Sequence, residues 1–234
     1  MTAPAASTPA KPVSVWEDFV DIFYAPTQVF ERRRDGKFGL ALLVLTVLAV
    51  IIYFATRGGM EAVMDVEFQR KAAEQMAKNP KITPEMMEKG RALSEKIAWL
   101  LVLVGIPVRA FVVGVVLWLL GKIVGATESI AAAVMVSTYA LFPRLLESLI
   151  AGVQGIMMDP NSITSRYSVT LSAARFLDPT TTNPILFKLA GQVDVFAIWT
   201  TILLAIGLAV TGRVSRGKAF AIAFVIWLLG AFFG

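Results

Sequence analysis

The chain has 234 residues, of which 56% are hydrophobic and 17% are charged, and it contains no histidine and no cysteine. Soluble domains usually carry about a quarter charged residues. Charged side chains are missing altogether from residues 38–56, 195–212 and 219–234, and a membrane-spanning helix needs roughly 20 predominantly apolar residues. The composition therefore excludes a soluble globular domain and predicts an all-α, polytopic membrane protein.

The missing residue types also exclude several kinds of chemistry. Without cysteine the chain forms no disulfide, thiolate nucleophile or Cys-ligated metal site. Without histidine it lacks Ser-His-Asp catalysis, the usual zinc sites and His-ligated haem. The formal net charge is +5, but the basic residues flank apolar segments and form no stripe with interleaved aromatics, so we expect no nucleic-acid partner. We expect no enzyme, no catalytic or metal-ligating residues and no cofactor.

The N-terminal region precedes the first long apolar segment. Residues 1–14 are small, Pro-rich and non-periodic, which predicts a disordered tail without a cleaved signal peptide. Residues 15–24 place apolar side chains on one face and acids on the other, as expected for a helix lying in the membrane interface. A cap packed on the helix bundle is the alternative. Ala25-Pro26 ends this helix, and residues 15–37 together form an interfacial helix with a basic flank.

Residues 38–234 are expected to form a membrane domain with five transmembrane helices. The expected spans are residues 38–56, 97–124, 130–158, 193–211 and 219–233. The N-terminal flank, Lys122 and the connection 212–218 together hold eight Lys/Arg on one side, and the positive-inside tendency makes that side cytoplasmic. Residues 57–96 also hold eight Lys/Arg, balanced by seven acids, but longer translocated loops follow the tendency less closely. We therefore expect a cytoplasmic N-terminus and an extracytoplasmic C-terminus.

Two extracytoplasmic pieces are expected between the spans. Residues 57–96 contain 15 of the 39 charged residues and predict a helical hairpin, whose second helix begins at Thr83 as N-cap and continues without a break into the next span. This insert is either a solvated spacer or a docking surface or lid. Residues 159–187 form the second outer loop, in which residues 168–177 fit either a short strand or a surface helix. Asp194 follows at the mouth of the fourth span, as a helix cap or an ion or substrate ligand.

Three charged residues fall near the middle of predicted spans. Arg109 follows Pro107 in the second span, and Arg144 and Glu147 follow Pro143 in the third. A central Arg costs roughly 2.5–3.5 kcal/mol on insertion scales, and such residues face the bundle interior or water. Each proline frees a backbone carbonyl and permits a kink.

A kinked helix pair would line a polar cavity at mid-depth. Its expected binding residues are Arg109, Tyr139, Arg144 and Glu147. The cavity would hold an anionic ligand, a lipid headgroup or a transported ion; the alternative is a buried polar cluster that fixes the helix register.

The segment Asp21–Phe30 resembles the IF-x-x-P-x-x-x-F signature near the N-terminus of bacterial Yip1-domain proteins, with Ile22, Phe23, Pro26 and Phe30 at the signature positions. Residues 195–219 look like the fourth and fifth membrane helices of that family. The resemblance covers most of the chain after residue 15 and implies five spans in a bacterial cytoplasmic (inner) membrane. It provides no catalytic residues.

The eukaryotic relatives in this family act in membrane traffic and bind small prenylated GTPases. This chain departs from them in its short N-terminal tail and its long charged hairpin, so GTPase binding is not carried over. The expected function is a membrane protein that organises lipids or partner proteins, including a second copy of itself. The alternative is a small-solute or ion permease or channel that uses the intramembrane Arg/Glu cluster.

Overall fold

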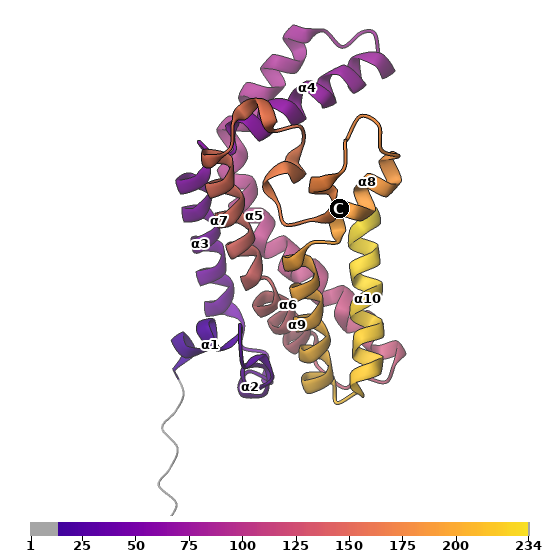
Figure 1. Ribbon diagram of the computed structural model, residues 1–234. Helices are drawn as coiled ribbons and strands as arrows, with labels where there is room; N and C mark the ends of the chain where they lie inside the picture. Colours follow the sequence, from indigo (N-terminus) through magenta and orange to yellow (C-terminus); the bar gives the residue numbers. More distant parts are fainter. Residues whose placement is uncertain (1–13, 234) are drawn as a thin grey trace, which may run out of the picture.

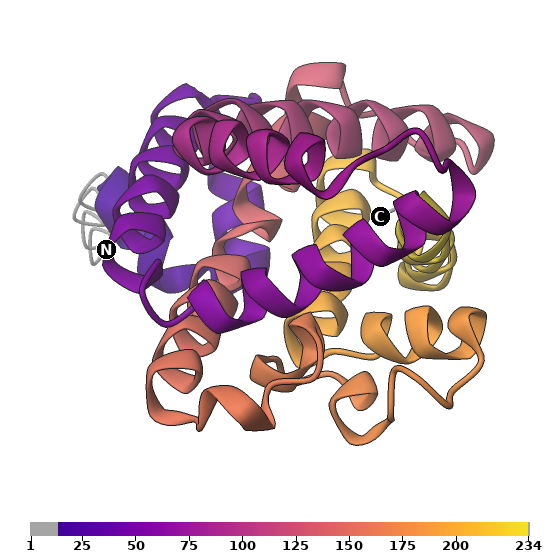
Figure 2. The ribbon, with the colours of Figure 1, turned by 90° about the horizontal axis from the view of Figure 1, so that it is seen from above.

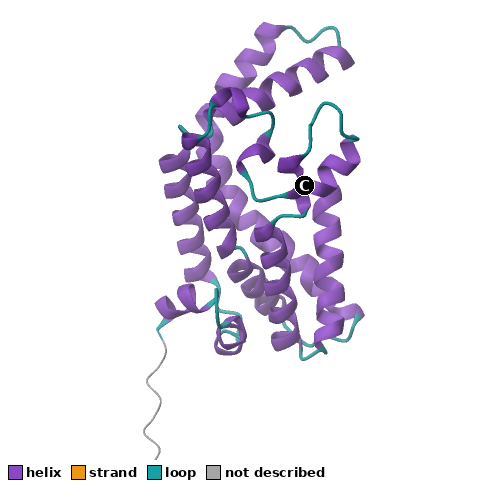
Figure 3. Cartoon of the chain, viewed as in Figure 1, coloured by secondary structure: helices purple, strands orange, loops and turns teal. Residues whose placement is uncertain are grey.

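The computed structural model describes residues 14–233, and the prediction for residues 1–13 lies outside them. Within this range the secondary structure is helical apart from one isolated β-bridge between Ser172 and Asp194, which confirms the all-α prediction (Figure 3). The helices are α1 (Val15–Asp21), α2 (Pro26–Arg32), α3 (Gly39–Thr56), α4 (Glu61–Lys78), α5 (Pro84–Ile123), α6 (Ile130–Ala140), α7 (Phe142–Met157), α8 (Pro184–Gln192), α9 (Val195–Gly212) and α10 (Arg216–Phe233), with the 3₁₀ turns η1 (Pro160–Ser162), η2 (Arg166–Val169) and η3 (Ala173–Phe176).

The long helices form an elongated bundle (Figure 1). At one end α4 and the start of α5 project as a hairpin, here called the hairpin end. At the other, the connection end, lie α1, α2 and the α5–α6 and α9–α10 connections. In the searched part of the chain, four stretches are long and apolar enough to cross a membrane: α3, α5, α6 with α7, and α9. A multi-spanning membrane protein is thus confirmed, and α10 as a fifth span stays a prediction.

Helix α6 lies at the centre of the bundle. Every residue from Ala132 to Ala140 is buried, and α6 packs against α5 and α9. Gly114 of α5 and Gly207 of α9 face the side chains of Val134 and Val136, where a Cβ would overlap. Small residues let the helix backbones approach closely at such contacts. The hydroxyl of Ser137 also donates to the Ala110 carbonyl at 2.5 Å.

Helices α3 and α5 lie at the periphery. Only 22% of the apolar window of α3 and 17% of that of α5 is buried, against 67% for α6 with α7. Leucines such as Leu43 and Leu101 are about three-fifths exposed, at 60% and 62%. Because a large exposed apolar surface is unfavourable in water, these faces are the ones that a bilayer would cover.

The contact between α3 and α7 at the hairpin end contains three glycines. A Cβ at Gly152 would overlap the side chain of Thr56, and a Cβ at Gly155 would overlap the carbonyl oxygen of Gly59. A Cβ at Gly59 would in turn overlap the Gly152 carbonyl. The two backbones touch here, which only glycine permits.

The predicted hairpin is present. Thr83 caps α5, its side chain accepting from the Met86 amide at 3.3 Å, and α5 continues unbroken into the apolar segment, as expected. An ion pair between Arg91 and Asp65 joins the two arms. Glu67 accepts a hydrogen bond from the backbone amide of Arg166 at 2.9 Å, so α4 also holds the outer loop. Seen from the hairpin end, α4 crosses in front of the bundle (Figure 2).

The outer loop differs from the expectation for residues 168–177. This stretch forms neither a strand nor a surface helix; the turns η2 and η3 occupy it. Side-chain hydrogen bonds favour these tight turns. Ser165 and Ser168 form a capping box around η2, and Arg175 donates to Gln154 of α7 and to the Thr170 carbonyl.

Candidate functional site

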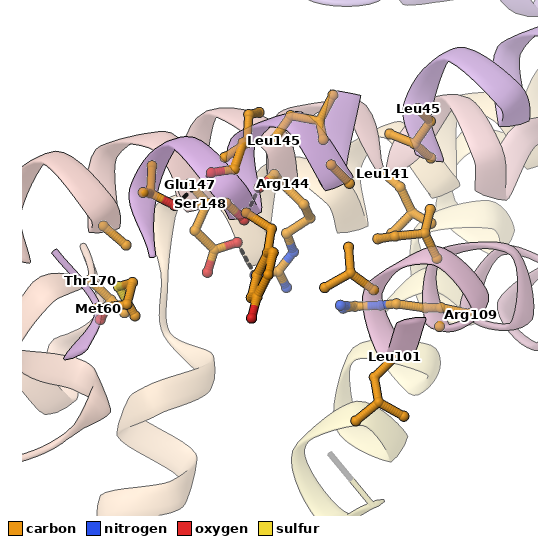
Figure 4. Close-up of a pocket in the computed structure, with 18 residues that line it drawn as sticks. Leu45, Met60, Leu101, Arg109, Leu141, Arg144, Leu145, Glu147, Ser148 and Thr170 are labelled. Carbon is orange, nitrogen blue, oxygen red and sulfur yellow. Dashed lines mark hydrogen bonds and ion pairs between the residues drawn. The ribbon is translucent and has the colours of Figure 1, made fainter. Parts of the chain in front are cut away.

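A cavity of about 550 Å³ lies between α3, α5 and α7 (Figure 4). It extends from Leu45 in the first half of α3 to Met60 and Thr170 at the hairpin end. Most of its lining is aliphatic, and its charged residues are Arg109, Arg144 and Glu147. Binding pockets of this size are common for small molecules and for cofactors.

Helical periodicity brings the lining residues to one face of each helix. Helix α3 contributes Leu45, Ala49, Ile52 and Thr56, which follow the three- and four-residue spacing of one helix face. Helix α5 contributes Leu101, Gly105 and Arg109, spaced four apart. The helical periodicity of α3 and α5 therefore determines which of their side chains line the cavity.

Arg109 and Arg144 both line the cavity, from different helices. Arg109 comes 14 residues before the end of α5, and Arg144 lies in the first turn of α7, just after the break at Leu141. At 1.5 Å per residue, Arg109 is about 21 Å along α5 from the connection that joins α5 and α6. In Figure 4 their guanidinium groups extend toward each other into the cavity.

The charges in the cavity do not balance. Arg144 and Glu147 form an ion pair at 2.5 Å, and the Arg144 Nε is buried without a hydrogen-bond partner. Among the described residues, Arg109 has no ion pair or hydrogen bond; the charges that act on it are those of Arg144 and Glu147. One uncompensated positive charge therefore faces an apolar space.

The two prolines have different effects. Pro107 lies inside α5, which continues through it as one helix. Pro143 lies in the first turn of α7. The predicted third span is interrupted there, at Leu141, into α6 and α7. This break lies three residues before Arg144, the first residue of the Arg144–Glu147 pair.

Tyr139 does not line the cavity with the other predicted binding residues. It is 1% exposed, its hydroxyl donates to Asp18 of α1 at 3.4 Å, and its ring stacks on Phe19 and Phe142. Tyr139 precedes the break at Leu141, so it stays on the α6 face that meets the N-terminal helices. The expected four-residue cluster is thus a three-residue cluster.

Asp18 is the centre of a second charged cluster, at the connection end. It is fully buried and pairs with Arg32 at 2.7 Å and Arg33 at 2.5 Å. Arg32 also pairs with Asp21 at 2.5 Å, whose pKa is lowered by its hydrogen bond from Tyr24 and by Arg32. These contacts clamp α1 and α2 on the bundle.

The N-terminal helix combines both alternatives considered from the sequence. One face of α1 is buried through Asp18, as in a cap. The opposite face exposes Trp16 and Val20, at 63% and 61%, and Tyr24, in the turn that follows α1, is 71% exposed. Trp16 and Val20 are four residues apart and share one helix face; together with Tyr24 they are here called the exposed ridge. Ser14, placed in the expected tail, is the N-cap of α1.

Asp194 is the N-cap of α9 and lies outside the cavity. Its Oδ1 accepts hydrogen bonds from the amides of Phe196 and Ala197 at 2.8 and 3.1 Å. The capping interpretation is therefore confirmed.

Sequence reasoning missed two buried acids, Asp18 and Glu128. Asp18 was grouped with the solvent-facing acids of an amphipathic helix, and its arginine partners lie 14 and 15 positions away. Glu128 is 5% exposed in the connection between α5 and α6. Its signal in the sequence is that it is the only charged residue between Lys122 and Arg144.

The apolar helices, the lipid-facing periphery and the buried polar clusters define a multi-spanning helical membrane protein. The family model of the Yip1 domain matches residues 20–234, and the chain belongs to this family. Membrane protein YknW of Bacillus subtilis (strain 168) is 25% identical over 210 residues, which cover 88% of this chain and 83% of YknW. The expected resemblance to prokaryotic Yip1-domain proteins is confirmed. No solved structure gives a significant match.

Proposed function

We propose that this protein binds an anionic amphiphile of the bilayer in the Arg109 cavity, and in this way organises lipids or partner proteins in the membrane without catalysis. The uncompensated charge of Arg109 in an apolar cavity carries the proposal. A guanidinium at this depth is unfavourable unless it is neutralised, and a phosphate or carboxylate accepts its paired N–H groups. The aliphatic lining suits a hydrocarbon chain.

The protein is proposed to cross a bacterial cytoplasmic membrane five times, with α10 as the fifth span and the connection end in the cytoplasm. The basic connections at that end support this orientation. The exposed ridge of Trp16, Val20 and Tyr24 would then lie in the inner membrane interface, where aromatic side chains are favoured.

This topology can be tested with single cysteines, because the chain has none of its own. Gly90 of the hairpin and Gly217 at the start of α10 both leave open space for a Cβ. A membrane-impermeant maleimide is expected to label Gly90→Cys in intact cells and Gly217→Cys only after permeabilisation. Labelling of both in intact cells would contradict the topology.

The lipid proposal predicts opposite effects for two cavity variants. Arg109→Leu is expected to weaken retention of phosphatidylglycerol about tenfold or more, because a hydrogen bond to a charged group contributes about 1.5–3 kcal/mol. Glu147→Gln is expected to strengthen it, because Arg144 loses its competing carboxylate. Both are measured by native mass spectrometry of protein released from vesicles of phosphatidylglycerol and phosphatidylcholine.

Arg57→Leu is the matched control, since Arg57 follows α3 and does not line the cavity. Equal retention by Arg109→Leu and Arg57→Leu would overturn the proposal. Ion and solute flux in the same vesicles tests the permease alternative. Flux that Arg109→Leu abolishes, with phosphatidylglycerol retention unchanged, would favour permeation instead.

A further inference from the structure

Glu128 is a buried acid outside the cavity. It lies in the connection between Ile123 and Ile130, where the ends of α5, α6 and α9 meet, and it is 5% exposed. Neither of its carboxyl oxygens has a hydrogen-bond partner among the described residues. A buried carboxylate without a partner is strongly unfavourable, whereas a protonated carboxyl is tolerated there.

Two glycines create the space for this side chain. A Cβ on Gly121 of α5 would lie 2.7 Å from one carboxyl oxygen of Glu128, and a Cβ on Gly212 of α9 would lie 2.6 Å from the other. The two carboxyl oxygens therefore lie in the space that a Cβ at each of these glycines would take. Gly121 and Gly125 form a GxxxG pattern, and in this structure Gly121 lies at a contact within one chain.

The charged groups around Glu128 are basic and bind backbone carbonyls. Lys122 of α5 donates to the carbonyls of Ala126 and of Glu128 itself, at 3.0 and 2.7 Å. Lys218 of α10 donates to the Val124 carbonyl at 3.3 Å, and Arg34, before α3, donates to the Val210 carbonyl. Arg213, the C-cap of α9, and Arg216, the first residue of α10, follow Gly212 in the chain.

A backbone hydrogen bond also joins the two chain segments beside Glu128, here called the junction. The amide of Thr127 donates to the carbonyl of Gly212 at 3.0 Å, which ties the α5–α6 connection to the end of α9. Arg213 follows in the left-handed conformation, with φ of 54°, and this ends α9 sharply beside Glu128.

We propose that Glu128 is a proton-binding site that lets the ends of α5 and α9 pack together when it is protonated and makes them separate when it ionises. On ionisation the carboxyl O–H bond breaks and the proton passes to water at the connection end. The carboxylate then leaves the space between Gly121 and Gly212 and pairs with the surrounding basic side chains. Lys122 is the nearest in sequence.

The direction of the pH effect follows from burial. Burial raises the pKa of the Glu128 carboxyl, while the residue's own backbone N–H and Lys122 act in the opposite sense. For an acid with a raised pKa in the folded state, the stabilisation is complete below the pKa of the unfolded chain and is lost as the pH rises through the raised value. The junction is therefore closed at low pH and opens as the pH rises.

The test uses spin labels on cysteines introduced at Ile123 and Gly217, both exposed, in the full chain reconstituted in vesicles. Between about pH 5 and about pH 9, a range that covers strongly raised carboxyl pKa values, we expect a longer distance population to grow. Glu128→Gln keeps the shape of the neutral acid and is expected to stay closed throughout. Glu88→Gln, on exposed α5 surface, is expected to follow the wild type.

A pH-independent distance in the wild type, or a Gln variant that opens as the wild type does, would overturn the proposal. A second measurement detects the protonation of Glu128 directly and does not depend on whether the Glu128→Gln variant adopts the closed junction. A component of the carboxylic-acid infrared band of the wild-type protein is expected to titrate at a higher pH than an exposed glutamate, and this component is expected to be missing in Glu128→Gln. A band unchanged in that variant would also contradict the assignment.

Discussion

Replacing Asp18 by asparagine is expected to destabilise the protein by about 3 kcal/mol and to release α1 and α2 from the bundle. The change keeps the size of the side chain but leaves Arg33 and one contact of Arg32 without a counter-charge. Removing one partner of a buried ion pair costs about 3–5 kcal/mol. Because the arginine side chains are partly exposed, at 24% and 17%, we expect a loss at the lower end of that range. Thermal unfolding in detergent measures the loss.

Limited trypsin digestion reports the release itself, because Arg32, Arg33 and Arg34 follow one another and become cleavable when α2 detaches. Glu17→Gln is the control, since Glu17 is exposed on the same helix. The double variant Asp18→Leu with Arg33→Met is expected to regain most of the stability, because removing both charges avoids an unpaired one. Equal unfolding of Asp18→Asn and Glu17→Gln would show that the clamp contributes nothing.

Replacing Gly155 by alanine is expected to cost about 1–3 kcal/mol or more, the usual penalty for overpacking a close contact. The new Cβ would overlap the Gly59 carbonyl oxygen, and backbone atoms on both sides leave no flexible side chain to move. The two helices must therefore separate at the hairpin end. Thermal unfolding checks the stability.

Gly90→Ala is the matched control for this contact. Gly90 lies in the exposed part of α5, where a Cβ meets nothing within 4 Å. Alanine is favoured over glycine in a helix by about 0.8–1.0 kcal/mol, so this variant is expected to be slightly more stable than the wild type. A Gly155→Ala protein as stable as Gly90→Ala would mean that α7 does not touch the backbone at Gly59, just after α3.

Elements determined by local chemistry were predictable from the sequence. Thr83 and Asp194 carry cap signals within three residues of the amides they bind, and the apolar segments are long enough to stand out. The meeting of Arg109, Arg144 and Glu147 in one cavity also follows from the short connection between their two predicted spans. Local patterns of this kind do not depend on the tertiary fold.

The missed features depend on contacts between distant segments. Tyr139 left the expected cluster because the chain breaks at Leu141, and its partner Asp18 is 121 residues away. Glu128 acquires its environment from Gly121 and Gly212, and Gly212 belongs to another helix. A single sequence without the fold contains no measure of which distant residues meet.

The uninterrupted course of α5 has a mechanical consequence. Its 40 residues measure about 60 Å at 1.5 Å per residue, about twice the thickness of the hydrocarbon core. One rod therefore joins the projecting hairpin, the Arg109 cavity and the Gly121 junction beside Glu128. Because this helix is unbroken, a tilt imposed on its hairpin half would also move the half that carries Gly121, so α5 would couple the two ends of the bundle.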